Sequence, residues 1–256
     1  MAELSLVQIL LAGGTIAAAS GLLGSFSLLR RMALVGDALS HVALPGIALG
    51  LLLHFNILLG SLAFLVAGTV GIWYVEHRTK LPIDTVVGVF FALSLAVGAL
   101  LIPEEEILEA LFGDIISLTT FDFFGALGLS LVIIFSLLYF SRQFILTLIS
   151  TDLSRSVGYK PHQLEFLFLL LFALTVAAGI KFIGATLMGA LIIIPAAASR
   201  NLTTSLAYYI LLSVLIGVAG SVAAILISFF YAQPAGPVFI LLVGAVFLVS
   251  IFFRRK

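Results

Sequence analysis

The chain has 256 residues, of which 62% are hydrophobic and 9% are charged, and its formal net charge is zero. Soluble domains contain about 25% charged residues, and a soluble fold of this size could not bury so many apolar side chains. Lipid is a solvent for apolar side chains, so the composition indicates a membrane protein in contact with lipid. The absence of cysteine excludes disulfides, thiolate metal ligands and thiol catalysis, and the balanced charge predicts no nucleic-acid partner.

Apolar runs long enough to cross a bilayer recur along the whole chain. A transmembrane helix needs about 20 mostly apolar residues, so we predict an all-α, polytopic membrane protein with about eight or nine transmembrane helices. The second and seventh runs are short or contain proline. The expected spans are 5–29, 39–54, 57–75, 84–102, 122–141, 163–181, 183–199, 203–231 and 236–253.

The placement of Lys and Arg favours nine spans in the cell membrane (inner or plasma membrane), with the N-terminus outside and the C-terminus inside. Cytoplasmic loops carry an excess of basic residues, and with nine spans only Lys181 falls outside. Joining 163–199 into one pass would instead put Arg200 and the basic C-terminal tail outside. The residues on the inner side are Arg30, Arg31, Arg78, Lys80, Arg142, Arg155, Lys160, Arg200, Arg254, Arg255 and Lys256. The largest outer loop is acidic, with Glu104, Glu105, Glu106, Glu109, Asp114 and Asp122.

Small residues recur every four positions on two of the predicted helices. Such ridges let membrane helices approach closely, so we expect them to be packing surfaces. The first helix carries Gly13, Ala17, Gly21 and Ser25, and the eighth carries Ser213, Gly217 and Ser221 together with Gly220, Ala224 and Ser228.

The most informative polar residues lie near the start of the second span. Asp37 and His41 are four residues apart and share one face of a helix, and Ser40 lies close to that face. A carboxylate and an imidazole at this spacing can hold one cation, or they can bond to each other and fix the start of the helix. Pro45 has no N–H, so the carbonyl of His41 loses its usual helical partner and becomes a further candidate ligand. Ionisable groups at membrane depth indicate function.

Two copies of the chain, meeting about a two-fold axis, would bring two carboxylates and two imidazoles together. Four nitrogen and oxygen donors suit tetrahedral Zn²⁺. Mn²⁺ or Fe²⁺ would accept the same ligands with added water or carbonyl oxygen, whereas the lack of thiols argues against Cu(I).

A polar inner loop at about 150–162 predicts a short helix. Asp152 can cap its start, Gly158 can end it, and Pro161 then begins a new helix. A short helix lying along the membrane is a surface that a cytoplasmic partner could push on, although an ordinary connection has the same pattern.

Other features are less specific. Pro195 is expected to kink the seventh span, and His54, His77 and His162 fall at loop or interfacial positions where we expect them to be solvated. The chain contains no P-loop, no H-E-x-x-H and no G-x-S-x-G motif. We therefore expect a protein that is not an enzyme and that does not itself hydrolyse ATP.

Several blocks of the sequence resemble the permease subunits of bacterial ABC importers for zinc, manganese and iron. The resemblance runs in order through LGSFSLLRRMALVGDALSHVALPGIALGLLL, LPIDTVVGV, EALFGDIISLT, KFIGATLMGALIIIPAAASR and FFYAQPAGPVFILLVGAVFLVSIFFRR. It implies one permease domain over residues 1–256, with a shortened form of the type II fold of the vitamin B12 permease. The blocks KFIGATLMGALIIIPAA and FYAQPAGP look closest to zinc permeases, so zinc is favoured and manganese or iron is the alternative.

The resemblance also implies partners and residue roles. The partners are a second copy of the chain, two cytoplasmic ATPase subunits and an extracytoplasmic metal-binding protein, and the metal is transported without a permanently bound cofactor. The aspartate and histidine of the G-D-A-L-S-H block, Asp37 and His41, would contact the metal, with Ser40 and Pro45 as further pathway residues. The residues implied in coupling to the ATPase are Asp152, Ser154, Arg155 and Gly158.

Two other classes of protein stay open on the residues alone. A secondary transporter or channel could use the Asp37–His41 pair as a proton-linked site and would need no ATPase. An intramembrane enzyme is a third class, which the missing catalytic motifs disfavour.

Overall fold

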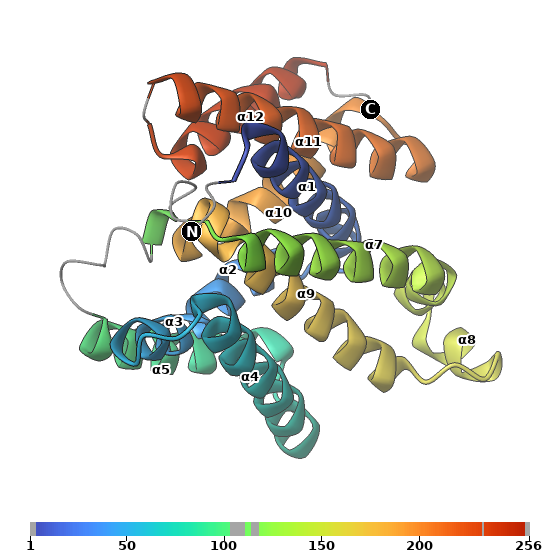
Figure 1. Cartoon of the computed structure of the whole chain (residues 1–256). Coiled ribbons are helices and arrows are strands. Elements are labelled where there is room, and N and C mark those ends of the chain that lie inside the picture. Colours follow the sequence, from blue (N-terminus) through green and yellow to red (C-terminus); the bar gives the residue numbers. More distant parts are fainter. Residues whose placement is uncertain (1–3, 103–110, 114–117, 232, 254–256) are drawn as a thin grey trace.

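The computed structural model describes residues 4–102, 111–113, 118–231 and 233–253, and the regular structure within them is entirely helical (Figure 1). Most of the acidic outer loop and the basic tail Arg254–Lys256 lie outside the described residues. The elements are α1 (Leu6–Leu29), α2 (Ala33–Val42), α3 (Leu44–Leu52), α4 (Ile57–Thr79), α5 (Ile83–Leu101), α7 (Thr120–Ile149), α8 (Thr151–Ser156), α9 (Pro161–Ile183), the 3₁₀ turn η2 (Ala185–Leu187), α10 (Met188–Leu202), α11 (Leu206–Tyr231) and α12 (Ala235–Phe252).

Nine helical segments in the described part of the chain are long and apolar enough to cross a membrane, which confirms the predicted all-α, polytopic fold. Two predicted boundaries were wrong. The second span begins at Ala33 rather than 39, because only a tight turn at Arg30–Met32 separates it from α1. The fifth continues to Ile149, beyond the predicted end at 141, because Arg142 and Gln143 are accommodated within the helix.

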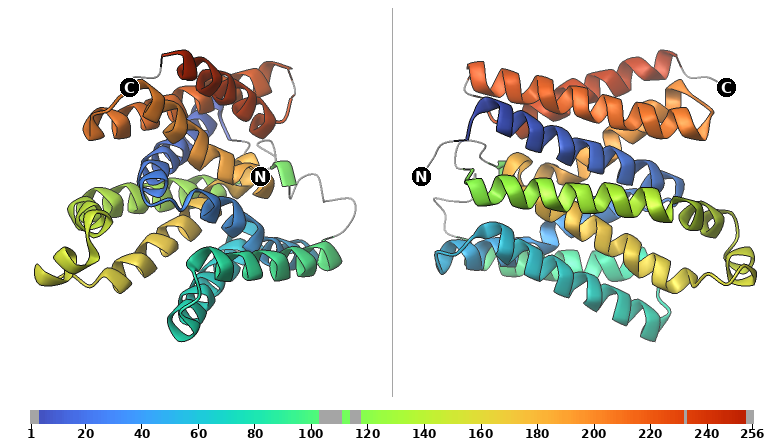
Figure 2. Two further views of the ribbon diagram at one scale, coloured as in Figure 1. Left: turned by 180° about the vertical axis from the view of Figure 1, so that it is seen from behind. Right: turned by 45° about the vertical axis from the view of Figure 1, so that its right-hand side comes forward.

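The long helices lie side by side in layers, as the right-hand view of Figure 2 shows. Helices α11 and α12 form one outer layer, α3, α4 and α5 form the opposite one, and α1, α7, α9 and α10 lie between them. The short helix α8 lies beyond the ends of α7 and α9. We call this the α8 end of the bundle; α1 begins at the opposite end, and α12 finishes at the α8 end.

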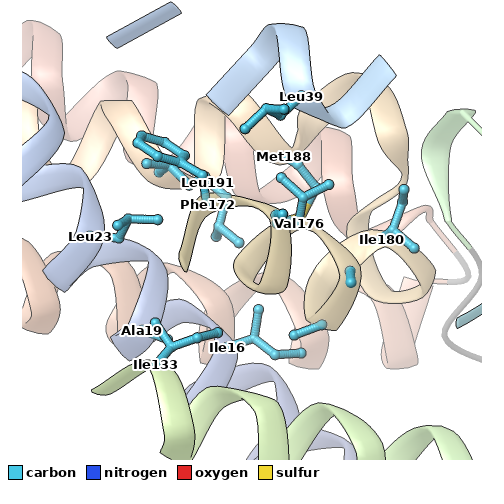
Figure 3. Packing of buried hydrophobic residues seen from close by; sticks show 14 of the residues in the cluster. Ile16, Ala19, Leu23, Leu39, Ile133, Phe172, Val176, Ile180, Met188 and Leu191 are labelled. Carbon is cyan, nitrogen blue, oxygen red and sulfur yellow. The ribbon is translucent and has the colours of Figure 1, made fainter. Parts of the chain in front are cut away.

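The core is formed mainly by α1, α9 and α10. Figure 3 shows Leu23 of α1, Phe172 and Val176 of α9, and Leu191 of α10 packed together with Leu39 of α2, and all five side chains are buried. By contrast, a much smaller share of α5, α11 and α12 is buried, and each exposes large apolar side chains. A large exposed apolar surface is expected where lipid replaces water as the solvent.

The predicted small-residue ridge on α1 packs against α11, which confirms its role in packing. The hydroxyl of Ser213 donates a hydrogen bond to the carbonyl of Gly21 at 2.7 Å, and Tyr209 Oη donates to the carbonyl of Ser25 at 3.1 Å. A Cβ added at Gly21 would lie 2.8 Å from the Ser213 carbonyl oxygen. The second ridge on α11 faces another helix, since Gly220 packs against Phe239 and Val243 of α12.

Lys181, the exception to the predicted basic-inside pattern, forms a buried ion pair. Its Nζ lies 3.0 Å from Oδ2 of Asp122, whose side chain is 1% exposed. Asp122 also accepts hydrogen bonds from Asn56 and from the backbone and hydroxyl of Thr119. A charge at membrane depth is costly unless it is paired. The network therefore explains how the charge of Lys181 is tolerated within the helix bundle. It also connects the start of α4 and of α7 to the end of α9.

Substitution of Gly21 tests the close contact between α1 and α11. Gly21→Ala should lower the unfolding free energy by about 1–3 kcal/mol, because the new methyl group would meet backbone atoms of Ser213 and Val214 that cannot rotate away. The control is Gly14→Ala on the same helix, where a Cβ meets nothing within 4 Å. Thermal unfolding in detergent measures both variants, and equal melting temperatures would contradict the packing described here.

Candidate functional site

The second span is interrupted at Ala43, two residues after His41. Helix α2 ends at Val42, and α3 begins at Leu44 with Pro45 in its first turn, where its missing N–H costs nothing. The carbonyl of His41 accepts instead from the N–H of Ala43 at the end of α2. The freed carbonyl therefore has one nearby donor and keeps a second lone pair.

Asp37 and His41 lie on the same face of α2, and both are half-buried. Gly189 of α10 packs directly on Asp37, since a Cβ at position 189 would lie 2.7 Å from the Asp37 Cβ and 2.9 Å from its Oδ1. The His41 ring meets the Phe91 ring of α5 edge-on, with centroids 5.0 Å apart at 80°. Three helices, α2, α5 and α10, thus surround the two polar side chains. The sequence analysis missed Gly189, because its role depends on which helix packs against α2.

The two side chains do not form a simple ion pair. None of the ion pairs within 4.0 Å in the described part of the chain joins Asp37 to His41, and Nδ1 of His41 is buried without a hydrogen-bond partner there. An unpaired buried polar atom costs about 1–3 kcal/mol. The interpretation of a self-satisfied pair is therefore not supported, and the imidazole has a nitrogen available for a ligand.

Ser40 and Pro45, the other two predicted pathway residues, are less accessible to a metal ion. The hydroxyl of Ser40 is fully buried and donates to the carbonyl of Asp37 at 2.6 Å. Pro45 is buried within the packing of α3. The structure therefore brings Asp37 and His41, but not Ser40 or Pro45, to a partly open face of the protein.

That face lies at the surface of the single chain. Leu34, one turn before Asp37, is 76% exposed, and Ala38 between the two polar residues is half-exposed. We call Leu34, Asp37, Ala38 and His41 the α2 stripe. One chain supplies one carboxylate and one imidazole at this stripe, which is half of a tetrahedral ligand set.

The predicted short helix in the inner loop is present as α8, but its cap differs from the prediction. Ser150, not Asp152, caps the helix, since its hydroxyl accepts from the N–H of Leu153 at 3.2 Å. Asp152 lies in the first turn and forms a 3.5 Å ion pair with Arg155, and both side chains are well exposed. Both residue types can cap a helix, and the register at which α7 ends selects the serine.

The predicted end of α8 at Gly158 is confirmed. Gly158 has φ +89°, a conformation that favours glycine. Its N–H donates to the Arg155 carbonyl, and the N–H of Tyr159 donates to the Ser154 carbonyl, which is the pattern of a Schellman motif. Pro161 then begins α9, as predicted.

The outer surface of α8 differs from its inner one. Ser154 is buried and shares a 2.9 Å hydrogen bond with Thr147, which holds α8 against α7. Leu153 and Val157 are 46% and 56% exposed. This apolar pair, which the sequence analysis missed, lies beyond the ends of the long helices with Asp152 and Arg155 nearby.

The remaining histidines divide into two groups. His54 is exposed in the turn before α4, as expected. His77 and His162 lie within α4 and α9, and their rings are 4.4 Å apart. Nε2 of His162 is buried, although the side chain as a whole is 38% exposed, so this residue is only partly solvated.

The nine apolar helices of the described residues define a polytopic helical membrane protein. The chain belongs to the ABC 3 transport family, whose sequence profile matches residues 3–254. The family predicted from the sequence is thereby confirmed.

Individual relatives extend this result. The manganese import system permease protein ScaB of Streptococcus gordonii is 31% identical over 93% of this chain and 87% of its own length. The high-affinity zinc uptake system membrane protein ZnuB of Haemophilus influenzae is 28% identical over 96% of this chain and 97% of its own. The solved structure of PsaBC from Streptococcus pneumoniae in complex with Fab has a TM-score of 0.85 and 28% identity, covering 99% of this chain and 93% of that one. The fold is also similar to that of a metal-chelate type ABC transporter in an inward-facing conformation, at 17% identity and a TM-score of 0.79.

The cap of α8 can be tested directly. Ser150→Ala should weaken α8 by about 1 kcal/mol and should speed hydrogen exchange of the Leu153 amide, which loses its acceptor. Asp152→Ala is the matched control and should change this exchange much less, because Asp152 does not accept from that amide. Hydrogen-exchange mass spectrometry of the segment 150–160 measures both, and a larger effect of Asp152→Ala would contradict the assignment.

Proposed function

We propose that this chain is the permease subunit of an ATP-driven importer for divalent metal ions, and that Asp37 and His41 contact the ion as it crosses the membrane. The observation that carries the proposal is the half-buried pair itself, a carboxylate beside an imidazole whose Nδ1 lacks a partner, inside a transmembrane segment. Membership of the ABC 3 transport family and the names of the manganese and zinc relatives support the same activity.

The working unit that we propose is a homodimer. The α2 stripe offers two ligands on an exposed face, and a second copy placed against it would bring the number to four. The half-exposed carboxylate and imidazole would then face each other across a central path rather than face lipid, where a charge is costly. Four nitrogen and oxygen donors can replace part of the water shell of a divalent cation.

The cargo that we favour is Zn²⁺, with Mn²⁺ as the main alternative and Fe²⁺ as a further one. Four donors from the paired residues complete a tetrahedral zinc site. Manganese has relatives named for it among the most similar proteins and would add oxygen ligands, for which the second lone pair of the His41 carbonyl is available. The ion is transported cargo, and we expect no permanently bound cofactor.

The whole chain, residues 1–256, is proposed to form a single permease domain whose loop at about 150–162 couples to a separate cytoplasmic ATPase. Exposed Leu153 and Val157, flanked by Asp152 and Arg155, give α8 a small apolar surface with charges beside it. Ser154 would anchor this surface to α7, and Gly158 would fix its end. Movement of the ATPase would then be transmitted along α7 and α9.

The orientation in the cell membrane follows from the same assignment. With the N-terminus outside and the C-terminus inside, the α8 end would face the cytoplasm. The basic loops would then lie on the cytoplasmic side, as is usual for membrane proteins. An extracytoplasmic metal-binding protein would deliver the ion at the opposite end. ATP binding would close the ATPase pair and move α8, the ion would pass to Asp37 and His41, and hydrolysis would reset the dimer. Because the ion must be released, these residues should hold it weakly.

Substitution of the two proposed ligands tests the site. Asp37→Asn and His41→Gln should each reduce metal uptake by at least about tenfold in proteoliposomes that contain the chain and its ATPase, because each change removes a charged or nitrogen ligand in both subunits. ATP hydrolysis without metal should stay close to that of the unsubstituted protein. His54→Gln is the matched control, since His54 is exposed at the opposite end of the bundle, and it should transport normally.

Gly158→Val provides a contrast within the same experiment, because a side chain at φ +89° is strained. It should reduce uptake and metal-stimulated ATP hydrolysis together, as expected for a coupling defect. Unchanged uptake by Asp37→Asn and His41→Gln would remove these residues from the pathway. Uptake that proceeds without ATP and follows a proton gradient would instead favour a secondary transporter.

Competition between ions tests the choice of cargo. Uptake of radioactive zinc should fall when unlabelled Zn²⁺ is added, and an equal concentration of Mn²⁺ or Fe²⁺ should compete less well, because the paired ligand set is tetrahedral. The measurement uses a strain lacking its own importers for these ions. Stronger competition by Mn²⁺ would reassign the cargo to manganese while leaving the ligands in place.

A further inference from the structure

A second group of ligand-type side chains lies where α4 meets α9, near the α8 end of the bundle. Glu76 comes from the last turns of α4, and His162 and Glu165 come from the first turn and a half of α9. Each residue offers one ligand atom, and the three atoms lie within 4.8 Å of one another. A carboxylate or imidazole atom bonds to a divalent metal at about 2.0–2.2 Å, so two ligands of one ion lie at most about 4.4 Å apart. A small rotation of these side chains would bring the three atoms onto one ion.

Two of these side chains have buried polar atoms that lack a partner. Oε2 of Glu76 and Nε2 of His162 are both covered, and neither has a hydrogen-bond partner in the described part of the chain. Nδ1 of His162 lies 3.9 Å from Oε2 of Glu165, which is longer than a hydrogen bond. Buried polar groups are normally paired, so these atoms indicate a missing ligand.

Charge also favours a cation at this point. Glu76 and Glu165 are close enough to repel each other, and a shared divalent ion would remove that repulsion. Arg30, in the turn after α1, is close enough for its charge to act on Glu165, and its guanidinium lies over the rings of Phe144 and Phe168. Burial lowers the pKa of Arg30, and the Glu165 carboxylate opposes this shift. Arg30 therefore offsets part of the negative charge of the two carboxylates, while its guanidinium stays in contact with the aromatic rings.

The group is also reachable from solvent. The side chains of His162 and Glu165 are 38% and 33% exposed. An ion could therefore approach these two side chains from the α8 end, whereas Oε2 of Glu76 and Nε2 of His162 are covered. All three ligands of this group come from one chain. Asp37 and His41, by contrast, are proposed to need a second copy of the chain to complete their ligand set.

We propose that Glu76, His162 and Glu165 form a second divalent-metal site, separate from Asp37 and His41, which binds a transition metal such as Zn²⁺ or Mn²⁺ from the α8 side. Two carboxylates and one imidazole are a ligand set that both ions accept, and water would fill the remaining positions. An ion held here joins α4 to α9. Because α9 begins directly after α8, occupancy of the site would restrict the movement of α9 relative to α4.

The chain carries a built-in reporter for this site. Trp73 is the single tryptophan of the sequence. Its ring centroid lies 5.3 Å from that of His162, and it stacks on His77 at 6.0 Å with an interplanar angle of 7°. A metal ion on His162 would change the electrostatic surroundings of the indole, so tryptophan fluorescence reads this site with no signal from other tryptophans.

The experiment titrates the whole chain in detergent micelles with Zn²⁺ and with Mn²⁺, following the fluorescence of Trp73 and counting bound ions by equilibrium dialysis. The parent for the series is the double variant Asp37→Asn, His41→Gln, so that the first site cannot contribute. We expect saturable binding of one ion per chain in this parent. Adding His162→Gln or Glu76→Gln should weaken the apparent affinity at least about tenfold, and Glu76→Gln keeps the side-chain shape.

Two controls make the result specific. His54→Gln in the same parent should bind like the parent, because His54 lies at the opposite end of the bundle. Melting temperatures show that each variant is folded, so a loss of binding in folded Glu76→Gln supports the site even if His162→Gln unfolds. Absence of bound ion in the parent overturns the proposal, and so does binding that Glu76→Gln and His162→Gln leave unchanged. Neither result bears on uptake through Asp37 and His41, which the transport assay measures separately.

Discussion

The hydrocarbon core of a membrane contains no water, so each buried polar group must find its partner within the protein. Most of the polar groups here follow this rule. Ser25, Thr175 and Ser199 donate to backbone carbonyls of their own helices, and the charge of Asp122 is met by Lys181. Eight buried side-chain atoms in the described part of the chain have no hydrogen-bond partner, and five of them are hydroxyl or indole groups, of Ser20, Thr69, Trp73, Ser130 and Thr186. The other three belong to His41, Glu76 and His162 and are of the kind that binds metal ions. The two proposed metal sites are both built from these exceptions.

The same constraint explains why small residues position the sites. Without a hydrophobic effect between helices, close packing supplies the association energy, and glycine allows the closest approach. Gly24 of α1 packs against the backbone of Ile192 in α10, and Gly189 of α10 packs against Asp37 of α2. A chain of glycine contacts thus runs from α1 through α10 to the α2 stripe. The position of Asp37 therefore depends on the close helix packing that Gly24 and Gly189 allow.

Helix α9 links the parts of the molecule that the proposals concern. It packs against α2, which carries Asp37 and His41, and against α4, which carries Glu76, while α8 leads directly into it. Its far end is held by the Lys181–Asp122 pair, and its near end contributes His162 and Glu165. A displacement of α8 would reach both proposed sites through this single helix. Metal binding at the proposed second site and contact of α8 with the proposed ATPase would then both act at the α8 end of the bundle.

The sequence by itself determined the properties that depend on neighbouring residues along the chain. Apolar runs predicted the nine spans, and the spacing of Asp37 and His41 placed them on one face, because a helix brings residues four apart together. The orientation inferred from the basic residues stays a prediction. The tertiary structure decided what depends on distant segments. It decided that Lys181 meets Asp122, that Gly189 packs on Asp37, and that His162 lies beside Glu76. Periodicity along one apolar helix does not show which of its faces meets which neighbour, since lipid and protein interior are both apolar.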